Sequence, residues 1–392
     1  MAGNFVLLVI DGLGVGAQED AHLYGDTGSN TLGHVSAVAK STLPNLGSLG
    51  IGNIIPLDSV PPVTHPEAAF GKMREVSSGK DSTTGHWELA GISLEAPFPT
   101  YPKGFPEEVV EGFDRITGAG GVLANLPYSG TAVIDDFGEE HLKTGKPIVY
   151  TSADSVFQVA CHEDVTSVET LYEWCRKARN QLMIGGHGVG RVIARPFSGK
   201  PGEFYRLTNS RKDFSLMPPP KNMLKVLLDN GIEVYSVGKV VDLFHPSLFT
   251  GYTKTDGNTH GLAVTRDMIK EVNNSLIFVN LIDTDQLYGH RLDVEGYSRC
   301  MEEIDQALPS ILEALDPTDV LLITGDHGND PSGTSTDHAR EFVPVLVYPV
   351  ERAQAVDLGT RKSFADVAAT VCAFFEVWET FGAQSVLSSW SA

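Results

Sequence analysis

Acidic side chains follow three predicted strands of this 392-residue chain at the point where each strand ends. The residues in these positions, with one adjoining histidine, are Asp11, Asp283, Asp285, Asp326 and His327. Because the carboxyl ends of parallel strands lie at one edge of a sheet, these carboxylates should meet there. Carboxylates held close together repel one another unless cations neutralise them. The pattern therefore predicts a metal site.

Histidines lie close to these aspartates in the sequence. His290 comes five residues after Asp285, and His338 ends the loop segment 336–338. Mixed aspartate and histidine ligation suits Mn²⁺ or Zn²⁺ better than Ca²⁺ or Mg²⁺, which prefer oxygen ligands. A single aspartate after a strand is more often a cap or turn residue, and a single histidine is usually structural. Their joint occurrence at several strand ends favours a metal centre.

A run of hydroxyl side chains in the segment 79–88 offers a nucleophile for such a centre. Ser82, Thr83 and Thr84 are consecutive and are followed by Gly85. A bound metal can lower the pKa of a hydroxyl group and so activate it for attack on phosphorus. The spacing does not choose among the three hydroxyls, and by itself it slightly favours a plain polar turn.

The elements that must position these residues alternate between strands and helices. Apolar, β-branched runs predict buried strands at 5–10, 232–237, 276–282 and 320–324. Helical patterns cover 222–229, 296–315 and 364–375, with a kink expected at Pro309 and an N-cap at Ser363. The alternation predicts an α/β fold built on a mostly parallel, doubly wound sheet with flanking helices.

Two proline-rich breakers divide the chain. They lie at 97–106 and 217–220, and they predict an inserted, smaller α/β domain over 100–217. The insert has short strand-like runs at 147–150 and 192–194 and a helical pattern at 168–179. The remaining segments, 1–99 and 218–392, should form one discontinuous catalytic core.

Composition limits the possible partners. The 29 Lys and Arg residues face 50 Asp and Glu residues, and a formal charge of -21 excludes nucleic acid as a partner. The four cysteines form no CxxC pair, which is typical of reduced thiols in a cytoplasmic protein. No run approaches the ~20 apolar residues of a membrane span, and the run 5–10 lacks the basic flank of a signal peptide. Nothing indicates an obligate protein partner.

Several motifs together resemble the phosphopentomutase family of the alkaline phosphatase superfamily. In the expected core they are DGLG at 11–14, KDSTTGHWE at 80–88, DQLYGH at 285–290, TGDHGND at 324–330 and TDH at 336–338. In the expected insert they are YTSADSV at 150–156 and GRVIARPF at 190–197. The resemblance thus extends through nearly the whole chain.

The resemblance implies particular roles for these residues. Thr84 matches the family's phosphorylated threonine, and the implied cofactors are two Mn²⁺ ions. The implied ligands of the two ions are Asp11, Thr84, Asp326 and His327 for one, and Asp285, His290 and His338 for the other. The insert corresponds to a cap domain that closes over the sugar. The implied substrate-binding residues are Ser152, Asp154, Arg191 and Lys239.

The implied reaction interconverts ribose 1-phosphate and ribose 5-phosphate, and the 2-deoxyribose pair, through a bisphosphorylated sugar. A sugar bisphosphate such as glucose 1,6-bisphosphate would prime Thr84. The same ligands would also serve a phosphatase or phosphodiesterase, and a non-catalytic metal-binding regulatory protein is a further alternative. A metal-dependent phosphoglycerate mutase is disfavoured, because those relatives are longer and place serine at the nucleophile. The chain departs from the family pattern at Gly325, where alanine is expected, and in the segment 183–189, whose His187 is not expected to be catalytic.

Overall fold

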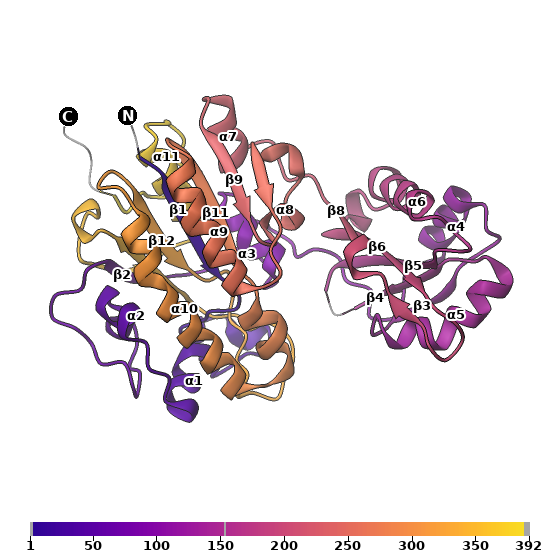
Figure 1. Ribbon diagram of the computed structural model, residues 1–392, viewed down its shortest axis with the longest axis horizontal. Helices are drawn as coiled ribbons and strands as arrows, with labels where there is room; N and C mark the ends of the chain where they lie inside the picture. The colour runs from indigo at the N-terminus through magenta and orange to yellow at the C-terminus, as the bar shows by residue number, and fades with distance from the viewer. Residues whose placement is uncertain (1–2, 153, 388–392) are drawn as a thin grey trace. The chain divides into compact units, whose positions relative to one another are not determined.

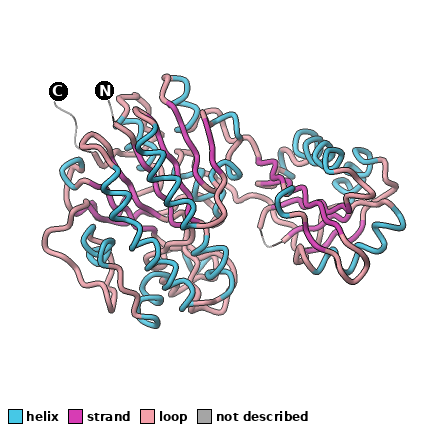
Figure 2. Tube along the Cα trace, in the orientation of Figure 1, coloured by secondary structure: helices cyan, strands magenta, loops and turns pink. Residues whose placement is uncertain are grey.

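A computed structural model describes residues 3–152 and 154–387 of the chain. The chain forms two compact units, shown in Figure 1 and coloured by secondary structure in Figure 2. The larger unit consists of Met1–Pro97, Pro218–Val241 and Pro246–Ala392, and the smaller unit consists of Phe98–Met217 and Asp242–His245. The short segment Asp242–His245 clusters with the smaller unit, which no sequence pattern indicated.

An eight-stranded sheet forms the centre of the larger unit. Its strands, in spatial order, are β10 (Gly251–Thr253), β9 (Glu233–Val237), β11 (Ser275–Leu281), β1 (Phe5–Ile10), β12 (Val320–Thr324), β13 (Val343–Tyr348), β2 (Ala69–Met73) and β14 (Asp357–Arg361). Only the two pairings that involve β13 are antiparallel, so the sheet is mostly parallel, as predicted. The three strands that end at the predicted site, β11, β1 and β12, are direct neighbours.

Helices cover both faces of this sheet (Figure 1). The helices of the larger unit are α1 (Thr31–Ala39), α2 (Pro44–Leu49), α3 (Ser82–Leu89), α7 (Met223–Asp229), α8 (Val240–Leu243, whose last two residues cluster with the smaller unit), α9 (Asn258–Glu271), α10 (Val294–Ala314) and α11 (Asp366–Phe374). Helices α1, α2, α9 and α10 pack on the face that carries Val6, Leu8 and Ile10. On the opposite face, Phe374 of α11 contacts Phe5 edge-on, with ring centroids 5.4 Å apart. Because side chains alternate along a buried strand, both faces must be apolar, which explains the continuous apolar runs.

Most sequence-based element boundaries agree with the structure to within two residues. The strand expected at 276–282 is Ser275–Leu281, and the helix expected at 296–315 is Val294–Ala314, with Pro309 inside it. The N-cap expected at Ser363 is wrong, because α11 begins at Asp366. The hydroxyl of Ser363 instead donates a hydrogen bond to the buried carboxylate of Glu88.

The smaller unit has its own mixed sheet and two small cores. Its strands are β3 (Leu123–Pro127), β4 (Ile148–Thr151), β5 (Val156–His162), β6 (Arg191–Ser198), β7 (Tyr205–Arg206) and β8 (Lys212–Ser215), and its helices are α4 (Glu107–Thr117), α5 (Ala132–Thr144) and α6 (Val168–Gln181). Helices α4 and α6 pack on one face of this sheet, and α5 covers part of the other.

The four cysteines of the chain are all buried and free. Within residues 3–152 and 154–387, no helix has the length and apolarity needed to cross a membrane.

Candidate metal centre

Three buried aspartates lie together at the carboxyl edge of the large sheet. Asp11 directly follows β1, Asp326 comes two residues after β12, and Asp285 lies in the π-helical turn Thr284–Tyr288 that follows β11. The backbone N–H of Gly12 donates to Oδ1 of Asp326 at 3.0 Å, and this bond joins the ends of two adjacent strands. The edge predicted from the sequence is therefore where these carboxylates meet.

One possible ligand group consists of Asp11, Asp326 and His327. All three are fully buried, and their ligand atoms lie within 4.8 Å of one another. Nε2 of His327 is 3.4 Å from Oδ1 of Asp11 and 3.4 Å from Oδ2 of Asp326. The ring is oriented by its other nitrogen, Nδ1, which lies 3.0 Å from the carbonyl oxygen of Gly328. With Nδ1–H donating to that carbonyl, Nε2 is left with a lone pair for a metal.

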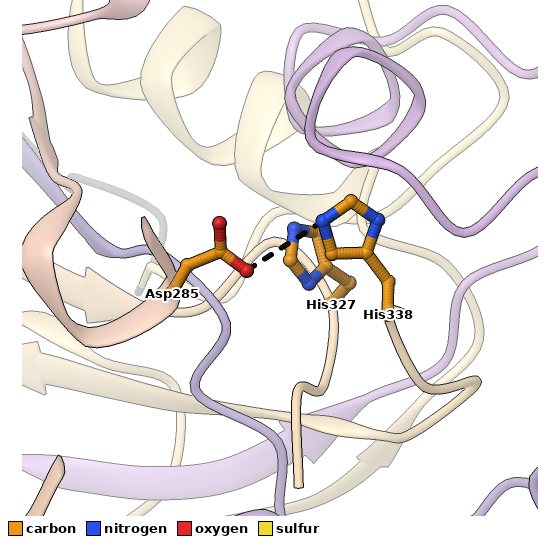
Figure 3. A group of neighbouring side chains, drawn as sticks. All are labelled: Asp285, His327 and His338. Atoms are coloured by element: carbon orange, nitrogen blue, oxygen red, sulfur yellow. Dashed lines mark ion pairs between the residues drawn. The ribbon is translucent and has the colours of Figure 1, made fainter. Parts of the chain in front are cut away.

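A second group consists of Asp285, His327 and His338 (Figure 3). Nε2 of His338 is 3.5 Å from Oδ1 of Asp285, and the rings of His327 and His338 have centroids 4.0 Å apart. His290 joins this group from the exposed side, with Nε2 3.2 Å from Oδ2 of Asp285. His327 belongs to both groups, which makes it the link between the two halves of the centre.

Electrostatics at the centre favour a cation. Burial and the charge of Asp285 raise the pKa of Asp11, but the hydrogen-bonded His327 and the ammonium of Lys239 outweigh them and leave that pKa below its ordinary value. Burial opposes a charge on His327, yet the carboxylates of Asp326, Asp11 and Asp285 raise its pKa well above its ordinary value. The carboxylates thus favour positive charge at this point, which a bound cation would supply.

The donor set fits a bound metal on structural grounds. Oδ2 of Asp326 is buried, and its polar neighbours are two imidazole nitrogens, Nδ1 of His86 at 3.1 Å and Nε2 of His327 at 3.4 Å. It accepts no hydrogen bond of good geometry from the described residues, and coordination to a metal would satisfy it. Together with imidazole nitrogens, these carboxylates form the mixed set that suits Mn²⁺ or Zn²⁺.

The hydroxyl-bearing turn lies at the N-terminus of α3, next to the first group. The hydroxyl of Ser82 is 3.4 Å from Oδ1 of Asp11 and 3.2 Å from Nε2 of His327. Thr84 is fully buried, and its hydroxyl donates to Oδ2 of Asp81 at 2.6 Å. Asp81 also caps the helix by accepting from the backbone N–H groups of Thr83 and Thr84. In this conformation Ser82, not Thr84, contacts the metal-ligand side chains, and the ligand role of Thr84 stays a prediction.

Two asparagines support the ligands and were not singled out from the sequence. Asn280 of β11 donates to Oδ2 of Asp11 at 2.8 Å, and Asn329 donates to Oδ1 of Asp285 at 2.6 Å. Asn280 also approaches Nε2 of His86 on α3, at 3.1 Å. Asn280 follows four consecutive apolar residues of β11, and this was a usable signal, because a buried polar side chain needs a partner.

Glu341 holds the loop after His338 against the core. Its fully buried carboxylate accepts from the backbone N–H and hydroxyl of Thr31 and from the N–H of Gly16. Burial outweighs these hydrogen bonds and raises the pKa of Glu341 to about 7. The folded protein therefore binds a proton here that the unfolded chain releases near pH 4.5.

We predict that Glu341 makes the free energy of unfolding fall as pH rises from about 4.5 through about 7. Relative to Glu341→Gln, the wild type should lose up to about 3 kcal/mol of stability between about pH 5 and pH 8. Urea unfolding of both proteins at the two pH values measures this. If the two proteins differed in unfolding free energy by the same amount at both pH values, Glu341 would titrate with its ordinary pKa.

The predicted substrate residues divide between the two units. Lys239 follows β9 in the larger unit, and its charge acts on Asp11. Arg191, Asp154 and Ser152 lie in the smaller unit. There Arg191 pairs with Asp154 at 3.7 Å and with Asp213 at 3.3 Å, while Ser152 follows β4 and is partly exposed. The structure thus joins Arg191 to Asp154.

The structure shows the surroundings of both departures from the family pattern, Gly325 and the segment 183–189 with His187. A Cβ at Gly325 would lie 2.3 Å from the carbonyl oxygen of Leu13, so alanine would require a backbone shift. In the smaller unit, Nδ1 of His187 lies 2.7 Å from the hydroxyl of Tyr101, and Nε2 lies 2.9 Å from Glu108. Both ring nitrogens of His187 thus have partners within the smaller unit.

Comparisons with known proteins agree with this site. The model of the Metalloenzyme superfamily matches residues 3–378. A phosphopentomutase from Caldanaerobacter subterraneus is 50% identical over 377 residues, covering 96% of this chain and 95% of the relative. One from Anaeromyxobacter sp. strain K is 52% identical over 383 residues, covering 97% and 98%.

Solved structures share the fold at low identity. A protein from Pyrococcus horikoshii superposes with a TM-score of 0.53 at 15% identity, covering 98% of this chain and all of the other. A phosphoglycerate mutase from Leishmania mexicana gives a TM-score of 0.50 at 13% identity, covering all of this chain and 98% of the other. The predicted alkaline-phosphatase-like α/β fold class is confirmed.

The fold and the paired ligand groups define a metal-binding enzyme of the Metalloenzyme superfamily. Within it, the chain belongs to the phosphopentomutase family. The protein is accordingly an isomerase, and the resemblance seen in its motifs is confirmed.

Proposed function

We propose that the protein interconverts ribose 1-phosphate and ribose 5-phosphate, and likewise the 2-deoxyribose pair. The observation that carries this proposal is the position of the hydroxyl-bearing turn at the metal centre. Ser82 contacts Asp11 and His327, so the N-terminus of α3, which carries Thr84, lies beside both ligand groups. Relatives that are about half identical along nearly the whole chain bear the phosphopentomutase name.

The proposed cofactors are two Mn²⁺ ions. Asp11, Asp326, His327 and Thr84 would hold one, and Asp285, His290 and His338 would hold the other. When bound, the ions supply positive charge that lowers the pKa of a hydroxyl and stabilises the oxygens of an in-line phosphoryl transfer. The burial of Asp326 without a hydrogen-bond donor of good geometry to Oδ2 and the mixed donor set support this assignment.

Thr84 is the proposed nucleophile. Phosphorylated Thr84 would transfer its phosphoryl group to the free hydroxyl of the sugar phosphate: the P–O bond to Thr84 breaks, and a P–O bond to the sugar forms. The bisphosphorylated sugar would then return its other phosphate to Thr84. A sugar bisphosphate such as glucose 1,6-bisphosphate would supply the first phosphoryl group. Asp81 supports the role, since it fixes the Thr84 side chain by a 2.6 Å hydrogen bond.

The proposed substrate contacts are Ser152, Asp154, Arg191 and Lys239. A second phosphate needs cationic partners, and arginine can bind it through two parallel hydrogen bonds. Residues 100–217 form the proposed cap, whose task is to keep water from the phosphothreonine, because hydrolysis there would make the protein a phosphatase. The cytoplasm is the proposed compartment, which the four free cysteines support.

The ratio of products tests the proposed reaction. Mn²⁺-loaded protein is incubated with ribose 1-phosphate and a trace of glucose 1,6-bisphosphate, and ³¹P NMR follows ribose 5-phosphate and free phosphate. We expect ribose 5-phosphate to form at least about 100 times faster than free phosphate, because transfer to a bound hydroxyl benefits from its effective concentration. If free phosphate were the main product, the protein would be a phosphatase that uses the same metal ligands, and the proposed mutase reaction would be wrong.

A further inference from the structure

A buried arginine contacts the segment that leads to the hydroxyl-bearing turn. Arg340 is 2% exposed and lies two residues after His338, a predicted metal ligand. Its guanidinium donates hydrogen bonds to three backbone carbonyls at alternate positions, those of Glu75 at 2.9 Å, Ser77 at 2.7 Å and Gly79 at 2.8 Å. Arginine can serve several acceptors at once, because its five N–H donors have a fixed planar arrangement. Arg340 therefore fixes the backbone of the segment 75–79.

The segment 75–79 is also bound by α3, the helix that begins with the hydroxyl-bearing turn. The carboxylate of Glu88 on α3 accepts from the backbone N–H of Val76 at 3.0 Å and from that of Ser77 at 2.7 Å. Glu88 and Arg340 are both buried, and hydrogen bonds to charged groups are stronger than those between neutral groups. The segment thus connects α3 to the loop that contains Arg340.

Gly79, at the end of this segment, lies directly against the side chain of Thr84. A Cβ at position 79 would lie 2.4 Å from Oγ1 and 3.0 Å from Cβ of Thr84. The φ angle of Gly79 is not in the left-handed region, so alanine there would be strained only by this contact. The hydroxyl of Thr84 meanwhile donates to Asp81 at 2.6 Å. Gly79 and Asp81 together therefore set the position of the Thr84 side chain.

Two acidic side chains accompany the charge of Arg340. Oδ2 of Asp20 lies 3.0 Å from its Nη2, and Oε2 of the buried Glu75 lies 2.9 Å from its Nη1. The ring of Tyr24 adds a contact, with its centroid 4.8 Å from Cζ of Arg340. Removing one partner of a buried ion pair is destabilising, because the other charge is left unpaired. A test of Arg340 must therefore keep its charge and change only its geometry.

We propose that Arg340 and Gly79 are positioning residues for Thr84. Arg340 holds the carbonyl of Gly79, and Gly79 in turn limits where the Thr84 side chain can lie. Both residues act through Thr84, so the assignment rests on the proposed function, in which Thr84 is the nucleophile. A displacement of a reacting group by about 1 Å can cost about 100-fold in rate. The three residues belong to the larger unit.

Arg340→Lys tests the role of the guanidinium. Lysine keeps the positive charge but has no planar fork with which to bind three carbonyls together. In the full-length, Mn²⁺-loaded protein we expect kcat with ribose 1-phosphate to fall at least about tenfold, while KM stays within about twofold. Gly79→Ala should do the same by displacing the Thr84 side chain, and it leaves the ion pairs of Arg340 in place. Metal content should equal that of the wild type in both variants.

Matched controls separate positioning from a general effect on the fold. Arg361 of β14, in the larger unit, also pairs with an aspartate, Asp366 at 2.7 Å, and donates to a backbone carbonyl, that of Gln384 at 3.3 Å. Arg361→Lys should therefore lower thermal stability and leave kcat within about twofold of the wild type. Gly186→Ala is the control for the added methyl group, because a Cβ at Gly186 would meet no atom within 4 Å.

The position of Thr84 can also be observed without turnover. Labelling of threonine methyl groups with ¹³C gives an NMR resonance for Cγ2 of Thr84, which Thr84→Ser assigns because serine lacks this methyl group. We expect this resonance to shift in Arg340→Lys and in Gly79→Ala. It should keep its wild-type position in the two control variants.

The two measurements distinguish failure of this assignment from failure of the proposed function. A wild type that makes no ribose 5-phosphate, while its Thr84 resonance responds to both substitutions, would refute the mutase reaction and support the positioning contacts. An unmoved Thr84 resonance with unchanged kcat in Arg340→Lys and Gly79→Ala would overturn the assignment. Equal losses of kcat in Arg340→Lys and Arg361→Lys would also overturn it, because Arg340 would then act only on the stability of the fold.

Discussion

Replacing Thr84 with alanine should stop both phosphorylation of the protein and turnover. The variant keeps the helix cap, because the carboxylate of Asp81 still accepts from the N–H groups of Thr83 and Thr84. It loses the one hydroxyl to which a phosphoryl group can be attached in the proposed reaction. We expect kcat to fall by at least about 10⁴-fold, as when a covalent nucleophile is removed from other enzymes. Intact-mass spectrometry after incubation with glucose 1,6-bisphosphate measures the phosphorylation.

Ser82→Ala is the matched control, because the hydroxyl of Ser82 is the one that contacts Asp11 and His327 in the structure. This variant should still become phosphorylated, and peptide mapping should find the phosphate on Thr84. A moderate loss of activity is compatible with its contacts at the ligands. If Ser82→Ala abolished the added mass while Thr84→Ala retained it, Ser82 would be the nucleophile and the assignment by resemblance would be wrong.

Replacing His327 with glutamine should have the next largest effect. His327 is the residue common to both ligand groups, and it is fully buried between Asp11, Asp326 and Asp285. Its loss removes a donor from each group. We expect the variant to retain less than about one metal ion per chain and to lose at least about 10³-fold in kcat/KM.

His290→Gln is the comparison for this experiment. His290 contacts Asp285 from the exposed side of the centre and is in neither of the two closest groups. The substitution should therefore lower the occupancy of the ion assigned to Asp285, His290 and His338 and leave the other ion bound. Elemental analysis after gel filtration gives the metal content, and circular dichroism checks that both variants are folded. Full metal content in His327→Gln together with loss of both ions in His290→Gln would contradict a shared role for His327.

Local sequence signals were sufficient for the strand-end carboxylates. An apolar run that stops at a polar turn marks the end of a buried strand, and β1 and β12 occupy the predicted residues. The order of strands then makes β11, β1 and β12 neighbours, so Asp11, Asp285 and Asp326 must meet at one edge. The mostly parallel sheet follows from the same kind of local pattern.

Local sequence patterns did not predict the direction in which individual side chains point. The sequence left three adjacent hydroxyls open, and the structure separates them because successive residues of a helix point about 100° apart. Ser82 is directed to Asp11 and His327, whereas Thr84 is directed to Asp81. The N-cap expected at Ser363 failed for a related reason, because the buried carboxylate of Glu88, 275 residues away in sequence, accepts from that hydroxyl.

The sequence by itself determined which residues could bind metal and which family pattern they follow. Only the tertiary structure showed that His327 belongs to both ligand groups, and that Asn280 and Asn329 orient two of the carboxylates. These relations join residues from separate strands and turns, and they depend on the packing distance between elements. A local pattern of residue types carries no information about that distance.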